Sequence, residues 1–126
     1  MKQWKIEHFQ CQSDSQKRLL DFIREENIHL KYLVTVLLRN GFKGKSLEEV
    51  EEYYNKFLKA DQLIEVLRDE IIDFDGMLKK EQLLDGRPLS NLYKIFSQIK
   101  RNIESARKEF AKLKNQFNTY ALEKLL

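Results

Sequence analysis

The chain has 126 residues, of which 42% are hydrophobic and 34% charged, with one proline and four glycines, a composition that excludes an intrinsically disordered protein. Its single cysteine excludes a fold held together by internal disulfides. The net charge of +3 conceals a segregation, because residues 1–45 carry net +4, residues 46–86 net −7 and residues 87–126 net +6. An acidic segment between two basic ones predicts complementary charges within one domain.

The first predicted helix covers residues 13–40. Ser13 with Gln16 three residues later matches a capping box, and Asn40-Gly41 supplies a left-handed stop. Between them apolar residues recur at helical spacing: Leu19, Ile23, Leu30, Leu33 and Leu37. We expect residues 1–12 to form an N-terminal arm.

Two longer helices are predicted at residues 46–84 and 88–124, joined by the turn Asp85-Gly86-Arg87-Pro88. Ser46 and Glu49 form a second capping box. In both helices apolar residues alternate three and four positions apart, as in coiled-coil heptads. The earlier helix carries Val50, Tyr53, Phe57, Ala60, Ile64, Leu67, Ile71, Phe74 and Leu78, and the later one Leu89, Leu92, Phe96, Ile99, Ile103, Ala106, Phe110, Leu113, Phe117 and Tyr120.

Short loops between three helices predict an all-α fold, an elongated antiparallel three-helix bundle with coiled-coil heptads over residues 13–126. If the e positions of the second and third helices face each other, Asp75 lies beside Lys100 and Asp61 beside Lys114. Exposed pairs of this kind contribute only about 0.2–1 kcal/mol each, so the apolar seam determines the fold.

The first helix carries more apolar residues than one seam needs, since residues 28–38 are apolar most of the way round. Two explanations remain open: the N-terminal arm covers this surface, or a partner does, either a second copy or a different protein. We expect a homodimer. The predicted interface residues are Ile28, Tyr32, Val34, Val36 and Leu38.

A basic stripe follows the third helix, made of Lys94, Lys100, Arg101, Arg107, Lys108 and Lys114. Such a stripe suits a phosphate backbone or an acidic partner. The aromatic residues Phe96, Phe110, Phe117 and Tyr120 lie in the apolar seam, where they cannot stack on bases, which favours a protein partner over nucleic acid.

Glu26 and His29 form a Glu-x-x-His motif of the kind that carries di-iron ligands in helical bundles. Such a site needs a second motif, and the other histidine, His8, lies in the predicted arm. The sequence therefore predicts no metal, no cofactor, no catalytic residues and no small-molecule substrate.

The segment Glu26–Lys31, the glycine turn and residues 53–80 (YYNKFLKADQLIEVLRDEIIDFDGMLKK) are similar to short all-helical proteins of bacteria that have no assigned activity. The resemblance implies a bacterial setting and carries over no functional residue. Glu7 and His8 interrupt any signal-peptide run, the apolar stretch 30–38 is too short to span a bilayer, and the lone Cys11 fits a reducing compartment.

Together these features predict a cytoplasmic, non-enzymatic module for protein–protein interaction or self-assembly, with no membrane association. The alternative is nucleic-acid binding through the basic stripe.

Overall fold

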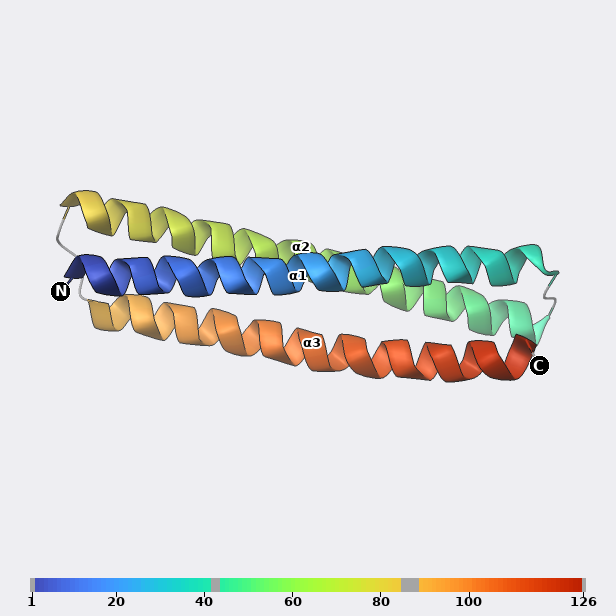
Figure 1. Ribbon diagram of the computed structural model, residues 1–126. Coiled ribbons are helices and arrows are strands. Elements are labelled where there is room, and N and C mark those ends of the chain that lie inside the picture. The colour runs from blue at the N-terminus through green and yellow to red at the C-terminus, as the bar shows by residue number, and fades with distance from the viewer. Residues whose placement is uncertain (1, 42–43, 85–88, 126) are drawn as a thin grey trace.

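The computed structural model describes residues 2–41, 44–84 and 89–125. They form three helices, α1 (Lys2–Arg39), α2 (Lys45–Leu84) and α3 (Leu89–Leu125). Figure 1 shows the three helices side by side, with α1 and α3 running in one direction and α2 in the other. The predicted all-α antiparallel three-helix bundle is therefore confirmed, and at 1.5 Å per residue it is a rod roughly 55 Å long.

The bounds of α2 and α3 agree with the prediction to within one residue. The predicted stop of α1 is also confirmed, since the backbone of Gly41 has φ +81° and its N–H donates to the carbonyl of Leu38 at 3.3 Å. The predicted turn at residues 85–88 lies outside the described residues.

The prediction that residues 1–12 form an arm and that α1 begins at Ser13 is wrong, because α1 begins at Lys2. Ile6 is buried, and the ring of Phe9 lies 5.9 Å from the rings of both Phe74 and Phe96. Packing against the other two helices thus extends α1 by three turns, and the capping box at Ser13 lies inside the helix.

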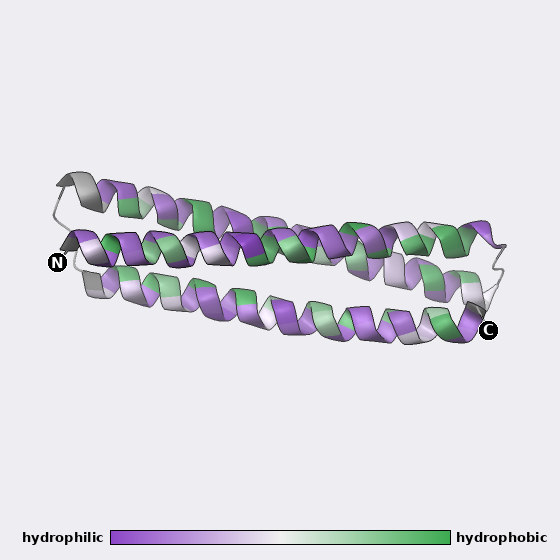
Figure 2. Ribbon diagram, in the orientation of Figure 1, coloured by the Kyte–Doolittle hydropathy of each residue, from purple (hydrophilic) through white to green (hydrophobic). Residues whose placement is uncertain are grey.

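The core follows the predicted seams of α2 and α3, and the knobs-into-holes geometry of their heptads stays a prediction. Figure 2 shows hydrophobic residues recurring at intervals along all three helices. On α2 and α3 the buried ones are Val50, Phe57, Ile64, Leu67, Ile71, Phe74, Leu78, Leu92, Phe96, Ile99, Ile103, Phe110 and Phe117. On α1 the buried row is Ile6, Ser13, Leu20, Ile23, Asn27, Leu30, Val34 and Leu37. Two polar residues therefore occupy seam positions of α1.

These two polar residues face aspartates of α2. The buried hydroxyl of Ser13 donates to Asp75 at 2.6 Å, and the amide of Asn27 donates to the carbonyl of Phe57 at 3.0 Å and to Asp61. Ser13 and Asn27 are separated by two heptads, as are the two aspartates. A shift of one heptad would place Arg68 opposite one of the polar residues, so these contacts fix the register of α1 against α2.

Lysine and arginine complete this polar seam. Lys17 pairs with Asp75, Lys31 with Asp61, and Arg68 of α2 with Asp21 of α1. The hydrogen bond with Asp75 raises the pKa of Lys17. The negative charges of Asp75 and Asp14 also raise it.

The predicted pairs between α2 and α3 are therefore wrong, because Asp75 and Asp61 point toward α1 and not toward Lys100 and Lys114. The handedness of the bundle determines this outcome. The apolar seams predict which residues are buried, but they leave open on which side of the hairpin of α2 and α3 the first helix packs.

Candidate functional site

The predicted partner interface on α1 does not form one exposed face. Val34 is 0% exposed within the core, Leu38 packs against that core, and Val36 is half-buried. Ile28 and Tyr32 are exposed, at 54% and 55%. The prediction is wrong for Val34, because α1 packs against both other helices and buries a wider apolar stripe than a helix with one neighbour does.

Three members of the predicted basic stripe, Lys100, Arg101 and Lys114, lie on the side of α3 that faces α1. Lys114 pairs with Glu26 of α1, and Arg107 pairs with Glu104 of its own helix. The other four members of the stripe are exposed and make no ion pair with any residue that the structure describes: Lys94, Lys100, Arg101 and Lys108. Among the described residues, no member of the stripe forms an ion pair with α2, despite the acidic charge of that helix.

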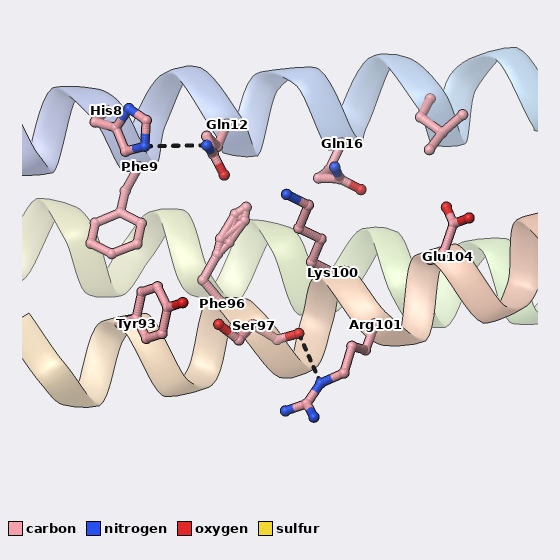
Figure 3. Close-up of a pocket in the computed structure, with 11 residues that line it drawn as sticks. His8, Phe9, Gln12, Gln16, Tyr93, Phe96, Ser97, Lys100, Arg101 and Glu104 are labelled. Atoms are coloured by element: carbon pink, nitrogen blue, oxygen red, sulfur yellow. Dashed lines mark hydrogen bonds between the residues drawn. The ribbon is translucent and has the colours of Figure 1, made fainter.

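A groove of about 640 Å³ opens between α1 and α3, and we call it the α1/α3 groove (Figure 3). It is lined by His8, Phe9, Gln12, Gln16 and Leu19 of α1 and by Tyr93, Phe96, Ser97, Lys100, Arg101 and Glu104 of α3. Residues 8–19 rise by roughly 16 Å, or three helical turns. The groove therefore has the length of a short helical segment.

The floor of the groove is apolar and belongs to the core. The rings of Phe9 and Phe96 lie 5.9 Å apart at an interplanar angle of 52°, and Phe96 is buried. Figure 3 shows Phe9 pointing from α1 toward Phe96 and Tyr93 of α3. Leu19 is half-buried and packs against the same core cluster. The floor is thus held in place by the packing that holds the bundle together.

Exposed aromatic rings surround one end of the groove. Trp4 is 66% exposed and stacks on His8, with ring centroids 5.7 Å apart and an interplanar angle of 8°. An Nε2···Nε2 hydrogen bond of 3.2 Å joins His8 to Gln12, and across the groove Tyr93 is 65% exposed. Flat faces suited to stacking therefore stand on both helices at this end.

The wall formed by α3 is positively charged. Glu104 also lines the groove, but Arg107 donates to its carboxylate at 2.6 and 2.9 Å. These hydrogen bonds lower the pKa of Glu104 and raise that of Arg107, so the two charges offset each other locally. Lys100 points from α3 toward Gln16 of α1 (Figure 3), and its charge and that of Arg101 set the sign of the wall.

The Glu-x-x-His motif does not assemble a metal site in the described part of the chain. The carboxylate of Glu26 accepts a hydrogen bond from Lys114, and His29 is exposed. Within residues 2–41, 44–84 and 89–125, no three histidine, cysteine, aspartate or glutamate side chains gather in a way that could hold a metal ion.

Sequence reasoning located Lys100 and Arg101 but missed His8, Phe9 and Tyr93. Because the first residues were predicted to form an arm, His8 and Phe9 were not assigned to a surface shared with the third helix. A signal for Tyr93 was present, since it lies seven residues before Lys100 on the same row of α3 and so shares its side of the helix.

None of the helices, over the residues that the structure describes, combines the length and apolar character that crossing a bilayer requires. Comparisons of the chain with protein-family models, with curated proteins and with solved structures each found no match. The resemblance to short bacterial helical proteins stays a prediction.

Proposed function

We propose that this protein is a non-enzymatic interaction module whose α1/α3 groove binds an acidic amphipathic helix of a partner protein. One observation carries the proposal: an apolar floor lies beneath a cationic wall whose Lys100 and Arg101 pair with no described carboxylate. The proposal retains the predicted class of function and moves the interface from the residues around Val34 to the groove.

The two surfaces of the groove match the two faces of such a helix. Apolar side chains of the partner would cover the half-buried Phe9 and Leu19 beside the buried Phe96, which removes exposed apolar surface from water. Carboxylates on its flank would meet Lys100 and Arg101, which adds orientation and faster association. Recognition of a helix in a groove uses this combination of a few apolar anchors and flanking charge.

Nucleic-acid binding is the second candidate, and the exposed rings favour it. Trp4, His8 and Tyr93 provide stacking faces beside the basic stripe, which is how many proteins bind single strands. The apolar floor between the helices favours a protein helix instead, because a phosphate backbone gains nothing from covering the half-buried Phe9 and Leu19.

The test uses three probes with the full chain and residue-resolved NMR. The first is a synthetic acidic amphipathic peptide roughly three turns long. The second has the same composition in scrambled order, and the third is a single-stranded oligonucleotide. We expect the amphipathic peptide to shift signals of residues 8–19 and 93–104 most strongly and the scrambled peptide to bind about tenfold more weakly.

Two double variants make the result specific. Lys100→Glu with Arg101→Glu should weaken peptide binding about tenfold. The matched control, Lys79→Glu with Lys80→Glu, makes the same change of charge at exposed positions of α2 and should have little effect. Equal losses in both variants, or no shifts at the groove, would contradict the proposal. Tight oligonucleotide binding that falls steeply between about 50 and 200 mM salt would favour the second candidate.

The predicted homodimer stays a prediction. The charge of the α1/α3 groove restricts which surface such a dimer could use. Groove-to-groove association would place the cationic walls of two copies, each with Lys100 and Arg101, in one interface, which like-charge repulsion disfavours. A symmetric dimer would therefore use another surface, for which Ile28 and Tyr32 are the exposed members of the predicted set.

A further inference from the structure

The buried core is divided in two near the middle of the rod. One cluster ends at Leu67 of α2 and Ile103 of α3, and the other begins at Ile64 and Phe110. On α3 the division falls at Ala106, between Ile103 and Phe110, and on α2 the small seam residue Ala60 lies one turn before Ile64; neither alanine is fully buried. Two alanines at positions that elsewhere hold large apolar residues leave the space between α2 and α3 unfilled.

A slot of about 390 Å³ occupies this space and reaches through the bundle to α1. Its lining includes Leu20 and Ile23 of α1, which are almost fully buried, and Phe110 of α3. Leu63 lies at the mouth and is 45% exposed. Cavities of this size lie within the range that binds small molecules, and the apolar floor suits an alkyl chain.

The mouth of the slot carries three lysines, Lys56 and Lys59 of α2 and Lys112 of α3, with the single acidic residue Glu109. Lys56 lies 3.8 Å from Glu52, whereas Lys59 and Lys112 are exposed and form no ion pair with the residues that the structure describes. The mouth is therefore positive although the chain is acidic over residues 46–86, which points to an anionic group at the opening.

We propose that this slot binds a medium-chain fatty-acid carboxylate, with the alkyl chain between Ala60 and Ala106 and the carboxylate at Lys59 and Lys112. Residues 56–64 of α2 rise by about 12 Å, a span that an extended chain of medium length fills. The site is independent of the α1/α3 groove, since no residue lines both.

Calorimetry with dodecanoate, below its micelle concentration, tests the proposal on the full chain. We expect saturable binding at one molecule per chain, no detectable binding of butyrate, and binding of dodecyltrimethylammonium at least tenfold weaker, because that head group carries the opposite charge. Unsaturable uptake, or equal affinity for the anionic and cationic amphiphiles, would overturn it.

Two variants locate the site. Ala106→Leu fills the slot and should lower dodecanoate affinity at least tenfold, whereas Ala111→Leu makes the same change at a residue that does not line it. Lys59→Gln with Lys112→Gln leaves the core untouched and should lower the affinity several-fold. Unchanged binding in both the Ala106 and the lysine variants would overturn the proposal. The groove variant Lys100→Glu with Arg101→Glu should bind dodecanoate normally, so failure of one proposal leaves the other standing.

Discussion

The two sides of α1 differ in how far the chain satisfies its own polar groups. Toward α2, three α1–α2 ion pairs and the buried contacts of Ser13 and Asn27 form a continuous polar seam. Toward α3, the described residues show a single ion pair, between Glu26 and Lys114, and the α1/α3 groove opens beside it. Polar groups that are paired within the chain determine how the helices pack. Charged groups that have no partner among the described residues are available to bind another molecule.

The largest expected effect on stability comes from disrupting the contacts between α1 and α2 at the buried residue Asn27. Asn27→Asp replaces the amide donor by a carboxylate that faces Asp61 and the carbonyl of Phe57. Breaking a buried polar pair in this way leaves an uncompensated charge and costs about 3–5 kcal/mol. We expect the free energy of unfolding in urea to fall by that amount at pH 7.

The control for this variant is Asn118→Asp, the same substitution at an exposed position of α3. It should change the stability by no more than about 0.5 kcal/mol. A loss below about 1 kcal/mol for Asn27→Asp would mean that Asn27 is not held against Asp61 as described.

Ser13→Ala tests the other end of the polar seam. It removes the donor to Asp75 but leaves that carboxylate paired with Lys17, so the cost is smaller, about 1.5 kcal/mol. Ser15→Ala, at an exposed position two residues away, should be close to neutral. If Ser13 were an N-cap instead, Ser13→Ala would reduce the helicity of the first turns, and circular dichroism in the folded state distinguishes the two roles.

Much of the fold was predictable because α2 and α3 carry long, uninterrupted apolar heptads. Phe57, Phe74, Phe96 and Phe117 fall on those seams and are all buried. The start of α1 was not predictable in this way, since Ser13 has the chemistry of a cap, and only its burial shows that it is a seam residue. Local sequence favoured a helix end where tertiary packing continues the helix.

The candidate site was predicted only in part, and the reason is geometric. Lys100 and Arg101 were recognisable from one helix, whereas the α1/α3 groove exists because residues 8–19 lie against residues 93–104. That neighbourhood depends on the handedness of the bundle, which the apolar pattern leaves undetermined. The contacts of Asp61 and Asp75 with α1 favour one handedness of the bundle over the other, but these contacts form only when the three helices pack together.

The smallest expected effects on stability come from the contact between α1 and α3. Two charge reversals on α3 test whether this contact depends on fewer ion pairs than the contact between α1 and α2. Lys114→Glu places a second carboxylate beside Glu26 and should cost about 1 kcal/mol, the upper range for a partly exposed pair. Lys100→Glu is the same substitution two heptads earlier, and it should cost less than about 0.5 kcal/mol because no described carboxylate pairs with Lys100. Urea unfolding of both variants measures the difference. Equal losses would mean that Lys100 also holds α3 against α1, and the cationic wall would then serve the fold and not a partner.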